Sequence, residues 1–431
     1  MAYRKTGTQL RQDGVSKKAC ALLWDESFAW GLMARQALME AGLPFDLLRS
    51  EEIRQGALSR YGMLYVPGGW ASQKLSALGN RGQEEIQRFV EDGGSYLGIC
   101  GGAGMATEDG IGLMPIQRKP TIERVPSVSG PVRISLKAHK LWQGIDRPIF
   151  FAWWPSQFRA ADQRVHVLAS YEEVLPDAFS SDISVADGRL IGWPALEARY
   201  GILLDPSRLH GEPAVLEGQF GRGKVFLSLI HFDTPGDRNG AVLLRNLWDY
   251  LTSGWSSDSP VRKMRSRRPP PPDSAELRKV IDEIRTAVSD LISAGSRNFL
   301  WYWRNPLLLQ WRRGVRGLEY GTLAVMIEEI GKRLGTDGGQ AHASSLDLLP
   351  LREDISEIRD QLIPFVEKAK ALVMRERFYM NTAALPPMGC ADHEINRLRL
   401  ELFGSAMSHD GHFKRLIDIV DRLLFNLMRE V

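Results

Sequence analysis

The chain has 431 residues, of which 44% are hydrophobic and 25% are charged, so it is long enough for two or three domains with buried cores. This composition excludes a wholly disordered chain, a collagen-like chain and a small disulfide-framework protein. The formal net charge of +3 does not provide the broad positive field of a protein that coats DNA.

Several features predict a reduced, cytoplasmic location. The cysteine count is odd, with Cys20, Cys100 and Cys390 in the chain, which indicates free thiols. No apolar run reaches the roughly 18 residues of a membrane span. Residues 1–14 are polar and lack the apolar region of a signal peptide, so we expect none.

The first part of the chain has the pattern of an α/β domain. Short apolar runs that predict buried strands alternate with helical patterns; the runs are CALLWD (20–25), PFDLLR (44–49), GMLYVPGG (62–69) and SYLGICGGA (95–103). Between the last two, residues 82–94 predict an amphipathic helix that ends at glycine. This alternation predicts a mostly parallel sheet covered by helices.

From about residue 130 the pattern favours strands. We expect them in PVRISL (131–136), RVHVLASY (164–171), PALEARY (194–200) and AVLEGQFGRGKVFLSLIHFD (214–233). Within the last segment, Gly221-Arg222-Gly223 predicts the turn of a β-hairpin.

The chain changes character near residue 255. A basic and proline-rich stretch follows, with RKMRSRR at 262–268 and four prolines at 269–272, which predicts a stiff linker. Apolar residues then recur with a helical period almost to residue 431, which predicts a separate all-α bundle of about five helices. The expected organisation is a tail (1–17), an α/β domain (18–255), a linker (256–273) and a helical bundle domain (274–431).

One pentapeptide predicts a nucleophile. Gly98-Ile99-Cys100-Gly101-Gly102 follows a strand and precedes a helix-like stretch, which is the glycine–nucleophile–glycine pattern of a nucleophile elbow. The turn would expose the Cys100 sulfur at the edge of the sheet, where the helix N-terminus stabilises a thiolate. The alternative is a small buried cysteine in a tight turn.

A cysteine nucleophile needs a base, and His231 is the best candidate. It follows the strand VFLSLI, and Asp233 lies two residues later, where both side chains of an extended chain point the same way. The carboxylate would then fix the imidazole tautomer and support the imidazolium. Gly68 and Gly69, after the third strand, permit close approach to a ligand, and the amides of Gly69 and Gly101 could form an oxyanion hole.

These three motifs, in this order, resemble the class I glutamine amidotransferase-like superfamily over about residues 18–252. The segments VPGGWA, GGSYLGICGGAGMA and GQFGRGKVFLSLIHFD look most like its biotin-protein ligase N-terminal domain branch. The resemblance implies a flavodoxin-like sheet, with Cys100 as nucleophile, His231 as base and Asp233 as acid. His-Phe-Asp stands here where that family has His-Pro-Glu. Asp25 and Glu26, after the first strand, are auxiliary candidates to orient the thiol, or else cap a helix.

The implied reaction is attack of a thiolate on a small amide or acyl substrate. We expect no metal and no cofactor, and we see no phosphate-binding loop for a fused synthetase. The alternative is a non-catalytic ligand-binding or scaffold protein of the same fold, whose helical domain binds a protein partner. Residues 297–316 hold five arginines, five aromatic residues and no acid. We interpret them as a helix packed in the bundle rather than as a membrane-surface or nucleic-acid-binding segment.

Overall fold

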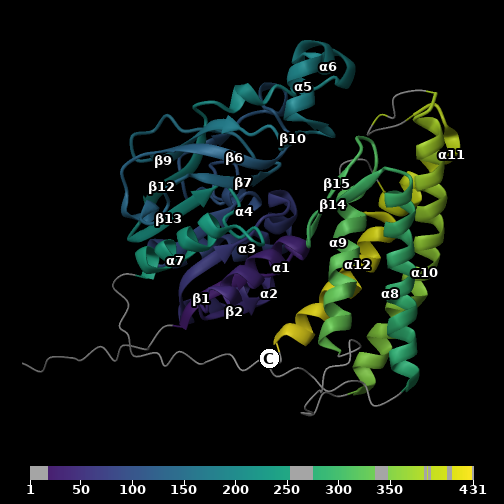
Figure 1. Ribbon diagram of the computed structural model, residues 1–431. Coiled ribbons are helices and arrows are strands. Elements are labelled where there is room, and N and C mark those ends of the chain that lie inside the picture. The colour runs from purple at the N-terminus through teal and green to yellow at the C-terminus, as the bar shows by residue number, and fades with distance from the viewer. Residues whose placement is uncertain are drawn as a thin grey trace, which may run out of the picture.

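The computed structural model describes residues 18–252, 275–334, 348–382, 386, 390–404 and 410–429. An α/β part occupies residues 18–252 and a mainly helical part occupies the described residues from 275 onward (Figure 1). The predicted tail (1–17) and the predicted linker (256–273) lie outside the described residues. None of the described helices is long and apolar enough to cross a membrane.

A mixed sheet of 11 strands forms the centre of the α/β part. Its parallel half has the order β2-β1-β3-β4-β13, and the four runs predicted as strands supply β1 to β4. Every residue of β3 and β4 is buried, because helices cover both faces, and this explains their unbroken apolar sequences. The bounds are β1 Lys18–Leu23, β2 Phe45–Leu48, β3 Tyr61–Val66, β4 Ser95–Ile99 and β13 Gly223–Ser228.

Helices connect and cover these strands. The predicted helix at 82–94 is the second half of the longer α3, whose backbone departs from helical geometry at Gly79 (φ 59°). The helix α4 is a short segment directly after β4, and α7 follows the last strand of the sheet. The bounds are α1 Phe28–Glu40, α2 Ser50–Arg54, α3 Ala71–Glu91, α4 Gly101–Met105 and α7 Arg238–Thr252.

The other half of the sheet is antiparallel. The predicted hairpin at Gly221 joins β12 to β13, with Phe220 paired to Gly223. The expected strand at 194–200 is wrong: these residues form the helix α6 Trp193–Tyr200, which has Pro194 in its first turn and Gly201 in the left-handed conformation after its end. The antiparallel strands are β6 Val128–Leu136, β7 Ile149–Trp153, β9 His166–Val174, β10 Phe179–Ser180, β11 Ile183–Ser184 and β12 Pro213–Phe220.

Smaller elements surround this half. A separate pair of short strands, β5 Gln117–Arg118 and β8 Phe158–Arg159, lies apart from the main sheet, and the helix α5 Val185–Ile191 precedes α6. Short 3-10 turns occupy Ala57–Arg60, Thr121–Glu123, Lys140–Trp142 and Pro206–Leu209.

Five described helices form the C-terminal part, in agreement with the predicted bundle (Figure 1). They are α8 Ala275–Arg297, α9 Gly317–Arg333, α10 Leu348–Tyr379, α11 His393–Phe403 and α12 Gly411–Arg429. The helix expected at 297–316 is wrong, because this segment forms a β-hairpin of β14 Trp301–Asn305 and β15 Leu308–Trp311. Asn305 accepts hydrogen bonds from the amides of Leu307 and Leu308, which makes the turn at Pro306.

The two parts share a continuous hydrophobic core. The helix α9 packs on α1, and α12 packs on β2. The β14–β15 hairpin reaches from the helical part towards the α/β part, so helical-part residues lie at the edge of the sheet where β1, β3 and β4 end (Figure 1).

Candidate functional site

The elbow at Cys100 has the strained backbone that a nucleophile elbow requires. Cys100 lies between the end of β4 and the start of α4 with φ 50° and ψ −102°, outside the usual regions for a residue with a side chain. Its amide donates to the Ser228 carbonyl oxygen at 2.8 Å, which fixes the turn against β13. The thiol is half-buried and lies 3.8 Å from the Trp153 carbonyl oxygen.

The glycines of the elbow are required by close packing. A Cβ atom on Gly101 would lie 1.8 Å from the Gly69 carbonyl oxygen, and one on Gly102 would lie 2.0 Å from the Val66 carbonyl oxygen. The backbone after β4 therefore rests directly on the backbone after β3. This contact brings the two loops of the predicted oxyanion hole together.

The structure places His231 and Asp233 in the predicted pairing. Both side chains are completely buried, and His231 Nδ1 lies 3.0 Å from Asp233 Oδ1. Burial would lower the pKa of His231, but the Asp233 charge and hydrogen bond, with a contribution from Cys100, raise it from 6.5 to about 9. Asp233 therefore contacts the imidazole directly, although the family that the sequence resembles has glutamate at this position.

The other imidazole nitrogen faces the nucleophile without bonding to it. His231 Nε2 is buried and has no hydrogen-bond partner among the described residues, the Cys100 thiol included. Cys100 is still close enough to contribute to the raised pKa of His231. The two predicted catalytic side chains therefore lie in one site.

Two residues of this site were not predicted. Tyr65 on β3 is buried and donates its hydroxyl to Asp233 Oδ2 at 3.1 Å. The Trp30 ring on α1 lies 4.9 Å from the His231 ring, centroid to centroid. The sequence offered one signal for Tyr65, a hydroxyl-bearing side chain near the end of a largely apolar strand.

The predicted oxyanion donors lie beside the nucleophile. Gly69 has φ +108°, and a Cβ on Gly101 would lie 3.2 Å from the Gly69 nitrogen. Neither the Gly69 nor the Gly101 amide donates a hydrogen bond within the described part of the chain. A Cβ on Gly68 would lie 3.1 Å from His231 Cε1, so this glycine packs against the imidazole.

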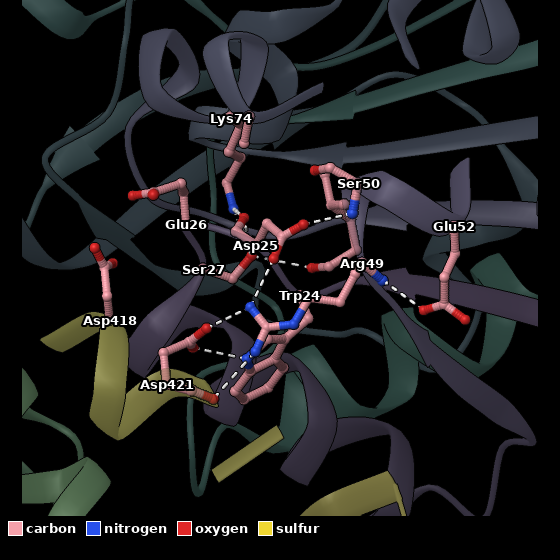
Figure 2. Close-up of polar contacts among 12 residues, drawn as sticks. Trp24, Asp25, Glu26, Ser27, Arg49, Ser50, Glu52, Lys74, Asp418 and Asp421 are labelled. Carbon is pink, nitrogen blue, oxygen red and sulfur yellow. Dashed lines mark hydrogen bonds and ion pairs between the residues drawn. The ribbon is translucent and has the colours of Figure 1, made fainter. Parts of the chain in front are cut away.

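The structure does not bring Asp25 or Glu26 into contact with the thiol. Asp25 pairs with Arg49 at 2.7 Å and accepts a hydrogen bond from the Ser50 amide, which begins α2, so it caps this helix (Figure 2). Glu26 lies 3.5 Å from Lys414 of α12. Both auxiliary candidates therefore belong to a polar network between the two parts of the chain.

This network centres on buried charged groups (Figure 2). Asp421 of α12 accepts hydrogen bonds from Trp24 at 2.7 Å and from Arg49 at 2.6 Å. Lys74 of α3 is completely buried and donates to the Asp25 carbonyl oxygen at 3.1 Å and to the Ser27 hydroxyl. Its side chain also packs beside Gly69, which links the network to the predicted oxyanion loop.

Aromatic and aliphatic side chains lie beside the site, where Trp30 packs on the His231 ring and the Trp153 carbonyl oxygen accepts from the Cys100 thiol. Trp30, Met33, Trp153 and Leu308 form a small buried cluster separate from the main core. Leu308 comes from the β14–β15 hairpin, and Trp311 of the same hairpin stacks 5.0 Å from Trp154. A segment of the helical part therefore packs against Trp30 and Trp153, the two residues that contact His231 and the Cys100 thiol.

Two arginines lie on another side of the elbow. A Cβ on Gly104 of α4 would lie 4.0 Å from the Arg118 side chain. Arg124 is close enough to Arg118 and Cys100 for charge interactions with both, and its Nε is buried without a hydrogen-bond partner. Neither arginine pairs with a carboxylate of the described residues. These residues also contain no cluster of three or more histidine, cysteine, aspartate or glutamate side chains that could hold a metal ion.

Fold and site together define an α/β protein with a mostly parallel half-sheet, a cysteine elbow and a buried histidine–aspartate pair at one sheet edge. Residues 56–109 match the family described as biotin-protein ligase, N terminal. This match spans β3, Gly68, Gly69, α3 and the Cys100 elbow, and it confirms the resemblance expected from the sequence. No curated protein matches the chain.

Three solved structures are similar to just over half of the chain. A putative GMP synthase component from Thermoplasma acidophilum is 12% identical (55% of this chain, 95% of that chain, TM-score 0.37). PurLQS from Thermotoga maritima is 14% identical (55% and 99%, TM-score 0.38). A putative ThuA-like protein from Bacteroides uniformis is 13% identical (60% and 99%, TM-score 0.36). Likeness at this level carries no argument about activity.

Proposed function

We propose that the protein is a cysteine-dependent amide hydrolase or amidotransferase-like enzyme, with Cys100 as nucleophile, His231 as proton carrier and Asp233 as the group that orients it. One observation carries this proposal: a completely buried histidine, held by aspartate at 3.0 Å, turns its free nitrogen towards a cysteine with strained backbone. A buried nitrogen without a partner costs stability, so a catalytic role accounts for it.

The raised pKa of His231 suggests the protonation state of the imidazole before a substrate binds. With a pKa of about 9, the imidazole carries a proton at neutral pH and would stabilise a Cys100 thiolate. The thiolate attacks the carbonyl carbon, and the amides of Gly69 and Gly101 donate to the resulting oxyanion. The intermediate collapses as the imidazolium protonates the leaving amine. His231 then takes a proton from water, which hydrolyses the thioester and releases the acid.

The substrate is a small amide or acyl compound in this proposal. Arg118 and Arg124 favour an acyl group that carries a carboxylate or phosphate, because both guanidinium groups lack an acidic partner among the described residues. Ammonia, if it is the product, would pass to a separate synthetase.

Alkylation kinetics followed by peptide mass spectrometry test the proposal. With limiting iodoacetamide at pH 7, we expect Cys100 to react at least about tenfold faster than Cys390, which is also half-buried and serves as internal control. His231→Gln should remove this advantage. Cys100→Ala should abolish turnover across a panel of amides and aryl esters. Equal reactivity of Cys100 and Cys390, or turnover that survives in Cys100→Ala, would contradict the proposal.

The second candidate is a non-catalytic binding or scaffold protein whose helical part mediates assembly. The tryptophans beside the site favour it, because Trp30 on the His231 ring and Trp153 beside the thiol suit contact with a bound ligand as well as a reaction. Equal alkylation of Cys100 and Cys390 together with no turnover would favour this candidate.

A further inference from the structure

A cavity lies between the two parts of the chain, apart from Cys100. Its volume is about 760 Å³, within the range of small-molecule sites. The helix α1 forms one wall, α8 and α9 form the opposite wall, and the β14–β15 hairpin closes one end. None of the predicted catalytic residues lines it.

An unpaired cation lies in the wall that α1 forms. Arg35 of α1 is only 6% exposed, yet its guanidinium makes no hydrogen bond or ion pair with any described residue. Burial and the nearby charge of Arg333 lower the pKa of Arg35, Glu329 opposes them, and the resulting pKa of about 10 keeps Arg35 charged at neutral pH. A buried charge without a partner is costly, which points to a ligand that supplies the counter-charge.

Two of the three acidic residues that line the cavity form ion pairs with arginines, and the third, Glu40, accepts a hydrogen bond from Gln36. Glu328 pairs with Arg285 at 3.0 Å, and Glu329 pairs with Arg333 at 2.8 Å. Their charges are therefore largely neutralised within the protein. Among the described side chains that line the cavity, Arg35 is the buried cation without an ion pair, whereas Lys332 is exposed to solvent.

The rest of the lining is suited to an apolar body. Leu32 of α1, Val288 and Ile292 of α8 and Leu307 of the hairpin present aliphatic side chains to the cavity. Ser289 and Ser293, one turn apart on α8, add hydroxyl groups at its side. An aliphatic chain of several carbons would bury apolar surface here, worth about 0.8 kcal/mol per methylene group.

We propose that this cavity binds a small amphipathic carboxylate, with the carboxylate on Arg35 and the aliphatic body against Leu32, Val288, Ile292 and Leu307. Arginine matches a carboxylate with two parallel hydrogen bonds, which a neutral head group cannot form. This site goes beyond the function proposed for Cys100 and does not depend on it.

Calorimetric titration of the full chain with octanoate and with 1-octanol tests the proposal. We expect saturable binding of octanoate, with 1-octanol at least about tenfold weaker. Arg35→Met should reduce octanoate affinity at least about tenfold and leave the affinity for 1-octanol unchanged. Arg88→Met, on the exposed side of α3, is the matched control and should bind octanoate as the wild type does.

Two further measurements separate binding from folding. Without ligand, Arg35→Met should have an unchanged or raised Tm, because it replaces an unpaired buried charge by an apolar side chain. Ser289→Trp keeps Arg35, begins at an exposed position and fills the cavity, so it should also lose octanoate binding. Octanoate binding that is undetectable in the wild type, or equal in Arg35→Met, would overturn the proposal. Cys100→Ala should bind octanoate normally, whatever the outcome at the nucleophile.

Discussion

The Tyr65 hydroxyl donates to one oxygen of Asp233 at 3.1 Å, while the other oxygen of the same carboxylate holds His231 at 3.0 Å. Both partners of Asp233 are buried, so its carboxylate is held from two sides. This arrangement extends the predicted set of three residues by a fourth, which reaches the nucleophile only through the other members.

Tyr65→Phe removes that hydroxyl and leaves the aromatic ring. We expect a loss of about 2 kcal/mol in the free energy of unfolding, typical of a buried hydrogen bond to a charged group. We also expect slower Cys100 alkylation, because Asp233 can turn away from His231. Urea denaturation and peptide mass spectrometry measure the two effects. Tyr61→Phe is the control, since the Tyr61 hydroxyl on the same strand donates to the Asp46 carboxylate at 2.9 Å, outside the site. Equal alkylation rates in Tyr65→Phe and the wild type would exclude a positioning role.

The raised pKa of His231 predicts a pH dependence of stability. Because the folded-state pKa of about 9 exceeds the ordinary value of 6.5, the folded state binds more protons between these values. The stabilisation is complete below about pH 6.5 and is lost as the pH rises through about 9. The pKa difference of His231 corresponds to a stabilisation of roughly 3 kcal/mol.

The difference between wild type and His231→Gln isolates this effect. Unfolding free energies at pH 6 and pH 10 should differ more in the wild type than in the variant. A difference that is the same in both proteins would show that His231 is not held as the charged form. Asp233→Asn should also reduce the pH dependence, since Asp233 raises the pKa of His231.

Gly101→Ala and Gly104→Ala form a matched pair on α4. A Cβ on Gly101 would overlap the Gly69 carbonyl oxygen at 1.8 Å, whereas the nearest atom to a Cβ on Gly104 is the Ala71 Cβ at 3.4 Å, an ordinary contact. We expect Gly101→Ala to cost more than about 3 kcal/mol of unfolding free energy, or to prevent folding. Gly104→Ala should change stability by less than about 1 kcal/mol. Thermal melts of both variants decide this, and equal melting temperatures would contradict the close contact of the two loops.

Sequence patterns predicted the features of this molecule that depend only on residues close together in the chain. Buried strands, helix periods, the Gly221 hairpin turn and the Cys100 elbow all follow from neighbouring residues. The β14–β15 hairpin was missed because its aromatic and aliphatic residues suit a helix in a bundle as well as a strand, and only the Asn305 turn separates the two. The strand expected at 194–200 is a helix that begins with a proline in its first turn.

The rest depends on contacts between distant segments. Tyr65 meets Asp233 across 168 residues, and Trp24 meets Asp421 across 397 residues. No spacing rule within one segment predicts such pairs. Asp25 and Glu26 were placed correctly at the edge of the sheet, but their partners, Arg49 and Lys414, come from β2's end and from α12. The contacts of these two acidic residues therefore depend partly on α12, and the sequence does not predict that this helix packs beside the first strand.

Leu308→Ala tests whether the hairpin covers the nucleophile. Leu308 is buried against Trp30, Met33 and Trp153, so truncation should cost about 2–4 kcal/mol and loosen the hairpin. Cys100 should then be alkylated faster, while Cys390 is unaffected. Leu309→Ala is the control, because Leu309 is equally buried on the same strand but packs beside Gly321 of α9. Faster alkylation in both variants would indicate general destabilisation instead of an uncovered site.

Lys74 belongs to the polar network between the two parts of the chain, and it makes the stability of the folded protein depend on pH. Burial lowers its pKa from 10.5 to about 7, although Glu26, Asp25 and Asp421 act in the opposite direction. Because the folded-state pKa is below the ordinary value, the unfolded state binds more protons between about pH 7 and 10.5. Lys74 therefore makes the folded state more stable as the pH rises through this range.

Lys74→Met removes the ionisable group and should flatten this rise. We expect the stability difference between wild type and Lys74→Met to shift in favour of the wild type from pH 7 to pH 10, measured by urea denaturation. Lys279→Met, at an exposed position on α8, controls for loss of a positive charge and should keep the wild-type slope. If the slopes of wild type and Lys74→Met are equal, Lys74 is not desolvated in the folded protein. Because Lys74 packs beside Gly69, the same variant should also slow any turnover that uses the Gly69 amide, and Lys279→Met should not.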